Sequence, residues 1–330
     1  MNFTKTLQEW YQLNHRSLPF RFNKDPYRVW ISEIMAQQTQ IETMIPFYER
    51  WMLQWPTLQA LSTATETELL KAWEGLGYYT RVRNIHKAVS QLADQNYNFP
   101  KSLDEIRTLA GIGPYTAAAI ASICFESKSV AIDGNVNRVV SRLFMFEDEL
   151  GSQTLLKKVT EKMEEWMKTA TPSIFTQAMM ELGALICTPK NPDCVHCPLN
   201  EECFALKNQS TQDIPKKKAS KTKPELYKKV ALLYSEDQKF ALTQSSNDSL
   251  MKGYWRFPEL YEVPEHALLI GSHHHVFTHL IWNLDFYFIK TQKNSDYHWF
   301  TSNEIEALPL ITAHRVFFKK TKSKIFSSEF

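Results

Sequence analysis

The sequence lacks an uninterrupted run of about 18 apolar residues, so we expect no membrane-spanning helix. Its first residues, MNFTKTLQEWYQL, lack both the apolar segment of a secretory signal and the arginine-rich pattern of a transit peptide. The chain also lacks a strong excess of charge, since 38 basic residues oppose 36 acidic ones among 330, and the composition alone does not mark a polyanion-binding protein. We expect a soluble, cytoplasmic protein that has no membrane partner.

Cysteine is scarce, with five residues in the chain, yet four of them fall within one stretch of 17 residues. Cys187, Cys194, Cys197 and Cys203 have the spacing C-x6-C-x2-C-x5-C. So short a loop cannot bury an apolar core of its own, but it can fold around a metal centre. Four thiolates at irregular short spacings are typical of iron–sulfur proteins, whereas structural zinc more often uses two C-x2-C pairs. We predict a [4Fe–4S] cluster, with zinc or disulfide bonds as the alternatives.

The length predicts two domains, and the character of the sequence changes near residue 207. Residues 1–206 are expected to form a helical domain that includes the cysteine loop at 187–203. Amphipathic stretches recur in it, separated by proline, glycine or short polar turns. These stretches are Tyr27–Arg50, Glu66–Trp73, Arg81–Gln95, Thr116–Phe125, Val136–Phe146, Gln153–Lys168 and Ser173–Ile186.

Residues 207–225 are polar, lysine-rich and without periodicity, so we interpret them as an interdomain linker. Residues 226–330 contain short stretches rich in aromatic and β-branched residues, which predict strands in an α+β domain. The expected strands are Tyr227–Tyr234, Phe240–Thr243, His275–Leu280 and Ile281–Lys290.

Two local patterns indicate helix starts. Gly111 and Gly113 flank one apolar residue ahead of the helical segment TAAAIASI. This pattern permits a tight hairpin whose exposed N–H groups could bind a DNA phosphate, although an ordinary helix–helix turn explains it equally well. Asp133 precedes a second periodic apolar segment, which predicts that its carboxylate caps that helix.

The hairpin, the helix-opening aspartate and the cysteine loop occur in that order over about residues 10–205. This arrangement resembles the helix–hairpin–helix DNA glycosylases of the endonuclease III and MutY type. The segment Pro26–Gln40 is similar to the helix that carries the catalytic glutamate in adenine glycosylases, and Gly75–Arg81 is similar to their DNA-wedging loop. The chain is therefore identified as a member of the MutY family, which implies an all-α glycosylase domain followed by a Nudix-like α+β domain.

Adenine leaves its sugar reluctantly as an anion, so its excision needs a carboxylic acid with a raised pKa that protonates the ring. Glu33 stands among apolar neighbours that disfavour its charged form, although a surface glutamate on an amphipathic helix is the alternative. The resemblance places Asp133 at the sugar, where it would stabilise an oxocarbenium-like centre. Tyr115 occupies the position of the lysine nucleophile in lyase-active relatives, which implies a monofunctional enzyme in which its hydroxyl positions Glu33 or the attacking water.

The resemblance also implies contacts with DNA. Tyr78 would wedge into the base stack and Leu76 would press on the opposing base, although a helix-capping turn is the alternative for this loop. Gln38 and Thr39 would bond to the strand left behind, and Arg21 matches a family position in the active site.

In the C-terminal region, the resemblance assigns inspection of 8-oxoguanine to the loop of Phe277, Thr278 and His279, with threonine in place of the family's serine. Residues 226–330 contain only two glycines, Gly253 and Gly271, and no dense glutamate cluster. We therefore expect no pyrophosphate hydrolysis from this domain.

The predicted function is removal of adenine opposite 8-oxoguanine or guanine from double-stranded DNA by a monomeric enzyme. One alternative is a thymine or uracil mismatch glycosylase of the same superfamily. Another is a DNA-damage-binding protein without catalytic activity, although such a protein would not need both Glu33 and Asp133.

Overall fold

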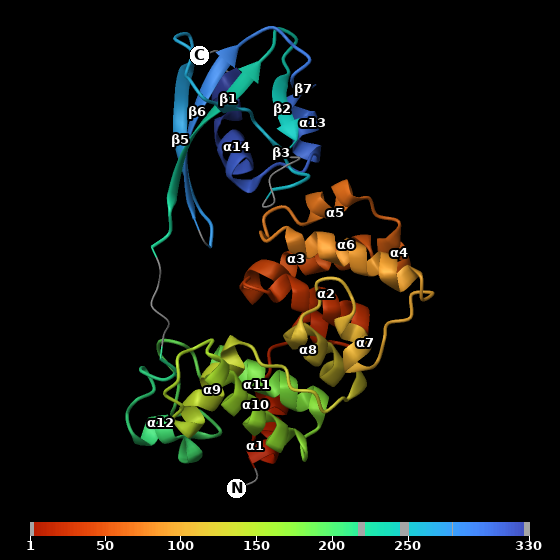
Figure 1. Cartoon of the computed structure of the whole chain (residues 1–330), viewed down its shortest axis with the longest axis vertical. Helices are drawn as coiled ribbons and strands as arrows, with labels where there is room; N and C mark the ends of the chain where they lie inside the picture. The colour runs from red at the N-terminus through yellow and green to blue at the C-terminus, as the bar shows by residue number, and fades with distance from the viewer. Residues whose placement is uncertain (1–2, 217–221, 245–250, 279, 327–330) are drawn as a thin grey trace. The chain divides into compact units, whose positions relative to one another are not determined.

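The computed structural model of the chain describes residues 3–216, 222–244, 251–278 and 280–326 (Figure 1). The chain divides into two compact units, one formed by Met1–Ser62 with Lys87–Ser220 and the other by Thr63–His86 with Lys221–Phe330. Within the described residues, no helix is both long and apolar enough to span a membrane.

The first unit is helical, as the sequence predicted. Its elements before residue 63 are α1 (Phe3–Asn14), η1 (Pro19–Arg21), α2 (Pro26–Ala36), α3 (Ile41–Gln54) and α4 (Leu58–Ser62). The boundary at residue 86 falls within α6 (Thr80–Ala93). The later elements are α7 (Leu103–Arg107), α8 (Pro114–Phe125), α9 (Gly134–Phe144), α10 (Gln153–Met167), α11 (Pro172–Leu185), η2 (Asn200–Glu202) and α12 (Phe204–Lys207).

One apolar core holds α1, α9, α10 and α11 together. Leu7, Val140, Val159 and Phe175 contribute one buried side chain from each of these helices, and each is 0% exposed. Helix α11 also packs against α8, which in turn packs against α2. The helices that carry the predicted catalytic residues, α2, α8 and α9, are therefore connected through their packing with α11 and α8.

The expectation of one continuous amphipathic stretch over Tyr27–Arg50 is wrong. Helix α2 ends at Ala36 and α3 begins at Ile41, with a turn between them in which Gln38 adopts a left-handed φ of 54°. A helix cannot continue through that conformation. The turn exposes a polar segment between two apolar helices.

Both predicted helix starts are present. Gly111 has a left-handed φ of 77°, which glycine adopts without strain, and Gly113 is the residue before the start of α8. Asp133 caps α9, since its Oδ1 accepts a hydrogen bond from the Val136 N–H at 2.7 Å. The predicted cap is confirmed.

Helices α9 and α11 approach closely at Gly183. A Cβ atom at this position would lie 2.5 Å from the Cβ of Asn135, in the first turn of α9. Glycine is therefore required at the crossing, and the contact fixes where α9 starts relative to α11.

The second unit contains a sheet, consistent with the predicted α+β domain. Its strands are β1 (Glu225–Tyr234), β2 (Phe240–Gln244), β3 (Trp255–Arg256), β4 (Glu259–Leu260), β5 (Leu268–Val276), β6 (Ile281–Lys290) and β7 (His298–Phe300). The described strands form a seven-stranded sheet in the order β3-β2-β1-β6-β5, with β4 paired to β1 and β7 paired to β2. Strands β1 and β6 are parallel, and β5 and β6 are antiparallel.

The expected strand His275–Leu280 is wrong in its extent, because β5 ends at Val276. The Phe277 N–H donates to the Leu280 carbonyl at 2.9 Å and closes a turn before β6. Helices α13 (Ser302–Ala307) and α14 (Thr312–Phe326) follow the sheet, and Phe317 of α14 stacks on Phe286 of β6 with ring centroids 3.8 Å apart.

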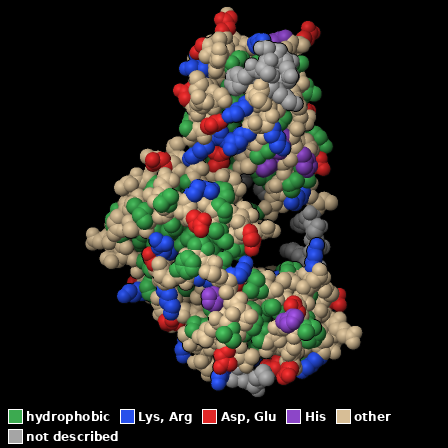
Figure 2. Space-filling view, turned by 180° about the vertical axis from the view of Figure 1, so that it is seen from behind, with side chains coloured by type: hydrophobic (Ala, Val, Ile, Leu, Met, Phe, Trp, Pro, Cys, Tyr) green, Lys and Arg blue, Asp and Glu red, His purple; other side chains and the backbone are tan. Residues whose placement is uncertain are grey.

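Helix α5 (Glu66–Ala72) belongs to this second unit. The Tyr254 hydroxyl donates to the Leu70 carbonyl at 2.7 Å, and Arg315 Nε donates to Glu74 at 2.6 Å. The domain boundaries expected from the sequence, which place α5 with residues 1–206, remain a prediction. Figure 2 shows acidic and basic side chains interspersed on the face in view, in keeping with the small net charge.

We expect Gly183→Ala to lower the free energy of unfolding by about 1–3 kcal/mol, because the added methyl group overlaps Asn135. Gly134→Ala is the matched control, since no atom lies within 4 Å of the Cβ that it would add. Alanine also favours a helix over glycine by about 0.5–1 kcal/mol. Urea unfolding followed by circular dichroism measures both variants, and unchanged stability of Gly183→Ala would contradict the close helix contact.

Candidate functional site

A cavity of about 760 Å³ opens in the first unit, a volume within the range of ligand-binding clefts. We call it the Glu33 cavity. Its wall is formed by parts of α2, α8, α11 and the start of α9. It brings together six residues that the sequence analysis singled out: Arg21, Glu33, Gln38, Thr39, Tyr115 and Asp133.

Glu33 projects from α2 and is half-buried between apolar neighbours that are fully or almost fully buried. Burial raises the pKa of its carboxyl group from 4.5 to about 7. A hydrogen bond with Tyr115 opposes this rise, the charge of Asp133 adds to it, and the charge of Arg21 opposes it. A carboxyl group with this pKa is partly protonated at neutral pH and can both give and take a proton.

Tyr115 lies in the first turn of α8. Burial raises the pKa of its hydroxyl group well above 10, and the charges of Glu33 and Asp133 act in the same direction. The hydroxyl therefore stays protonated at neutral pH. It hydrogen-bonds to Glu33 and lies 3.9 Å from the sulfur of Met180.

Asp133 faces the same cavity from the start of α9. Besides its bond from Val136, its Oδ2 accepts from Asn135 Nδ2 at 2.8 Å. Burial raises the pKa of Asp133, and these hydrogen bonds and the charge of Arg138 only partly offset the effect. The hydrogen bonds at the helix start therefore favour the ionised carboxylate, but burial is the larger influence on its pKa.

Glu181 of α11 binds two arginines on the wall of the Glu33 cavity. Its side chain is 0% exposed, and its carboxylate accepts from the Arg16 backbone N–H at 2.8 Å, from Arg16 Nε and Nη2 at 3.0 Å, and from Arg21 Nη2 at 2.8 Å. Burial alone would raise the pKa of Glu181. The hydrogen bonds from the two arginines outweigh burial and lower the pKa to about 2.

The turn between α2 and α3 forms another part of the wall. Gln38 is exposed, and Thr39 Oγ1 donates to the Gln37 carbonyl at 3.3 Å. Gly111 and Gly113 are exposed on the same unit but are not among the residues that line the cavity.

In the second unit, the structure brings Tyr78 and Thr278 together. Their hydroxyl groups are in direct contact, Tyr78 is 37% exposed, and Thr278 is exposed. Phe277 packs between His275 and Trp282, with ring centroids 4.6 and 4.8 Å away. Leu76 is 6% exposed, and His279 lies outside the described residues.

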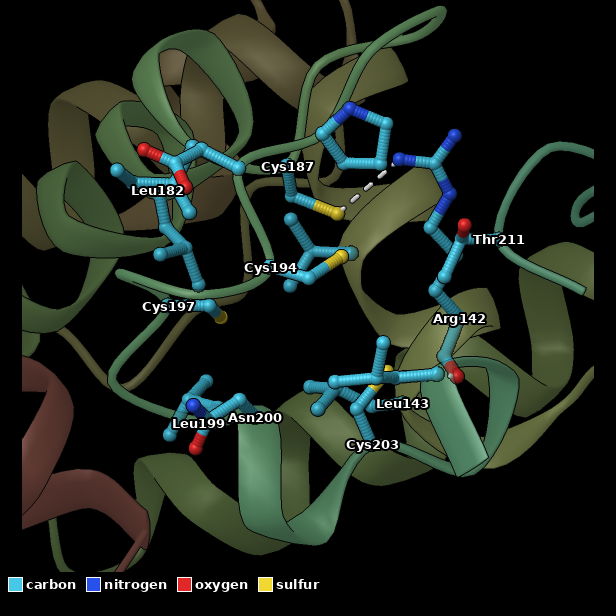
Figure 3. A pocket seen from close by; sticks show the side chains of 15 residues that line it. Arg142, Leu143, Leu182, Cys187, Cys194, Cys197, Leu199, Asn200, Cys203 and Thr211 are labelled. Atoms are coloured by element: carbon cyan, nitrogen blue, oxygen red, sulfur yellow. Dashed lines mark hydrogen bonds between the residues drawn. The ribbon is translucent and has the colours of Figure 1, made fainter. Parts of the chain in front are cut away.

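The four cysteines Cys187, Cys194, Cys197 and Cys203 line a single cavity in the first unit (Figure 3). Arg142 of α9 is 2% exposed and donates from Nη1 to the Cys187 sulfur at 3.3 Å. In the part of the chain that the structure describes, no three histidine, cysteine or acidic side chains lie close enough together to hold one metal ion. A cubane cluster offers a separate iron to each thiolate, so four cysteines around a common cavity fit its donor set.

Arg138 connects the cysteine loop to the start of α9. Its Nε donates to the Cys187 carbonyl at 2.6 Å, and its Nη2 donates to the Gly183 carbonyl at 2.7 Å and to Asn135 Oδ1 at 2.8 Å. Since Asn135 also donates to Asp133, a continuous chain of hydrogen bonds runs from the loop to the Glu33 cavity.

Sequence reasoning missed Glu181, Asn135 and Arg138. Glu181 lies among the buried residues of α11, three positions after Ala178, and an acid at such a position indicates a buried ion pair. Arg138 gave no comparable signal, because its partners Cys187 and Gly183 are distant in the sequence. Asn135 gave none either, because its close approach to Gly183 appears only in the fold.

Comparison with known proteins gives matches over both units. The family described as HhH-GPD superfamily base excision DNA repair protein matches residues 31–169, and the NUDIX domain family matches residues 229–320. The adenine DNA glycosylase of Rattus norvegicus is 38% identical over 213 residues, which are 62% of this chain and 41% of the rat protein. The adenine DNA glycosylase of Buchnera aphidicola subsp. Schizaphis graminum is 34% identical over 262 residues, which are 78% of this chain and 74% of that protein.

Two solved structures resemble the helical part of the chain. A thermostable thymine-DNA glycosylase has a TM-score of 0.57 at 23% identity, covering 62% of this chain and 95% of that one. Endonuclease III in a trapped covalent intermediate with DNA has a TM-score of 0.51 at 25% identity, covering 63% of this chain and 96% of that one. These likenesses agree with the predicted helical fold.

We expect Glu33→Gln to stabilise the folded chain at alkaline pH. Folding raises the pKa of the Glu33 carboxyl group from 4.5 to about 7. The free energy of unfolding of the unsubstituted chain should therefore fall as the pH rises through this range, because the unfolded chain releases the proton more readily. Relative to the unsubstituted chain, the free energy of unfolding of Glu33→Gln should therefore increase by up to about 3 kcal/mol between pH 4.5 and 8.5. Urea titrations across this range provide the measurement.

Glu9→Gln is the control for this comparison, since the Glu9 side chain is 61% exposed on α1. Its difference from the unsubstituted chain should be independent of pH. If the Glu33→Gln difference is equally flat, the carboxyl group of Glu33 does not have a raised pKa.

Proposed function

Because this chain belongs to the family of adenine DNA glycosylases, we propose that it hydrolyses the N-glycosidic bond of adenine in double-stranded DNA. The adenine is one mispaired with 8-oxoguanine or guanine, and the chain acts as a monomer. The observation that carries the proposal is the Glu33 cavity, in which a carboxyl group of raised pKa faces a second carboxyl group and a half-buried tyrosine.

The reaction begins when the adenine leaves the base stack, at a cost of a few kcal/mol. Glu33 in its protonated form donates its proton to N7 of the ring. The bond between the sugar and N9 then breaks, and its electron pair stays with the now neutral adenine. Glu33, left as a carboxylate, takes a proton from the water that attacks the sugar, which restores the acid for the next turnover.

Asp133 stabilises the positive charge that develops on the sugar. The hydrogen bonds from Val136 and Asn135 hold its carboxylate in one orientation. Tyr115 takes the position that a lysine nucleophile has in lyase-active relatives, and a phenol cannot form a Schiff base. The enzyme is therefore monofunctional and leaves an abasic site, and Tyr115 keeps Glu33 in position through its hydroxyl group.

The remaining residues bind the DNA. Arg21, Gln38 and Thr39 contact the nucleic acid at the Glu33 cavity, where all three line the wall. Gly111 and Gly113 bind a phosphate through N–H groups at the start of α8.

The second unit carries the residues that recognise the lesion. Tyr78 and Leu76 act on the base stack, and Phe277, Thr278 and His279 inspect the base opposite the adenine. The threonine hydroxyl supplies the hydrogen bond that a serine would give, with an added methyl group that restricts its rotamers.

Cys187, Cys194, Cys197 and Cys203 hold a [4Fe–4S] cluster. The fit rests on the four thiols that line one cavity, with the positive charge of Arg142 next to Cys187. When bound, the cluster would cross-link the two ends of the loop, at Cys187 and Cys203, through its middle cysteines. The hydrolysis transfers no electron, so its role is structural.

Single-turnover base release tests the function. Three duplexes differ in one pair, with adenine opposite 8-oxoguanine, adenine opposite guanine, or thymine opposite guanine. We expect free adenine from the first two, with strand breaks only after alkali. Release of thymine would favour the mismatch-glycosylase alternative, and tight binding without any release would favour a binding protein.

We expect Glu33→Gln to slow adenine release by about 10²–10⁴-fold, because the amide cannot act as the general acid. DNA affinity should stay close to that of the unsubstituted chain, and Glu9→Gln should release adenine at the unsubstituted rate. Full turnover by Glu33→Gln would overturn the assignment of the acid.

We expect the chain purified without oxygen to contain about four iron atoms and about four inorganic sulfides. Cys197→Ser should lose most of this iron, whereas Cys124→Ser, which changes a cysteine outside the loop, should retain it. Metal analysis and visible absorbance provide the measurement. One zinc ion per chain without sulfide would contradict the cluster.

A further inference from the structure

Three charged residues on the wall of the Glu33 cavity have no assigned chemical step. The side chain of Glu181 is 0% exposed, that of Arg21 is 12% exposed and that of Arg16 is 27% exposed. This cluster of two cations and one anion carries a net positive charge, and it lines the same cavity as the acid Glu33.

Glu181 determines where this charge lies. Its Oε1 accepts hydrogen bonds from the backbone N–H and Nε of Arg16, and its Oε2 accepts from Nη2 of Arg16 and Nη2 of Arg21. Arg21 has weaker contacts elsewhere, a hydrogen bond of 3.4 Å to the Arg16 carbonyl and a distance of 5.7 Å from its guanidinium carbon to the ring centroid of Tyr11. Arg16 also approaches Glu42 at 3.5 Å, but that side chain is 76% exposed.

We propose that Glu181 is a positioning residue for base excision, which holds Arg16 and Arg21 on the cavity wall and offsets the charge that Arg21 presents to Glu33. The proposal rests on the role of Glu33 as the acid. It deepens that role by naming a residue whose charge adds to burial in keeping the acid protonated at neutral pH.

The direction of the effect follows from the charges. The positive charge of Arg21 favours the ionised form of Glu33 and so lowers its pKa. The negative charge of Glu181 opposes this influence while the two groups remain 2.8 Å apart. The other titratable or charged groups that line the cavity or act on Glu33 are Arg16, Glu42, Tyr115 and Asp133.

The experiment measures the single-turnover rate of adenine release against pH. In the unsubstituted chain, the rate should fall as the pH rises through about 7 and Glu33 loses its proton. We expect Glu181→Gln to move this fall about one pH unit lower, so that the rate is about tenfold slower on the alkaline side and nearly unchanged at low pH. A merely structural role would slow release by the same factor at every pH, and that result would overturn the proposal.

Two further variants keep the test decisive. Glu181→Asp retains the negative charge, so the fall should stay at the pH of the unsubstituted chain even if the rate is lower; a shift as large as that of Glu181→Gln would contradict the proposal. The double variant Arg21→Gln, Glu181→Gln lacks both charges. The pH at which its rate of adenine release falls should therefore return towards that of the unsubstituted chain. If Glu181→Gln does not fold, the Glu181→Asp variant and this double variant carry the test.

Glu126→Gln is the matched control. Glu126 is exposed, pairs with Lys24 and Ser173, and is not among the residues that line the cavity, so its substitution should leave the pH profile unchanged. Failure of the proposed function would appear separately, as full adenine release by Glu33→Gln or no release by the unsubstituted chain. An unshifted profile in Glu181→Gln, with Glu33 still required, would overturn only the role of Glu181.

Discussion

The contact between α9 and α11 at Gly183 and Asn135 is the constraint on which the rest of the site depends. It sets where α9 begins and therefore where its capping residue, Asp133, faces the Glu33 cavity. One turn later, Arg138 reaches across to α11 and the cysteine loop. Two residues before Gly183, Glu181 binds the two arginines. A single helix crossing thus locates the second carboxylate, the charged cluster and the cysteine loop.

The Glu33 cavity contains two carboxyl groups whose pKa values are shifted in opposite directions by their surroundings. Glu33 is placed among apolar side chains with few hydrogen bonds, so burial dominates and its pKa rises to about 7. Glu181 is more deeply buried, but both of its oxygens accept hydrogen bonds from guanidinium groups, and its pKa falls to about 2. Environments that push similar groups apart in this way allow one carboxyl group to carry a proton while another remains charged.

Local signals in the sequence predicted much of this arrangement. The cap at Asp133 and the helices that follow it were predictable because a capping side chain and apolar periodicity act over a few residues. The break at Gln38 was not, since the segment from Tyr27 to Arg50 continues an amphipathic pattern through it. The partners of Glu181 were also out of reach, because Arg21 is 160 residues away in the sequence and only tertiary packing brings the two together.

Helix α5 and its neighbours in Thr63–His86 have a consequence for biosynthesis and for protein engineering. Their hydrogen-bonding partners Tyr254, Thr312 and Arg315 follow them by 184, 233 and 241 residues in the sequence, so these contacts cannot form until that later part of the chain has been synthesised. The C-terminal region consequently cannot be exchanged for that of a relative by joining the two chains at the lysine-rich segment, residues 207–225. A chimera would retain a complete interface only if Thr63–His86 came from the same parent as Lys221–Phe330.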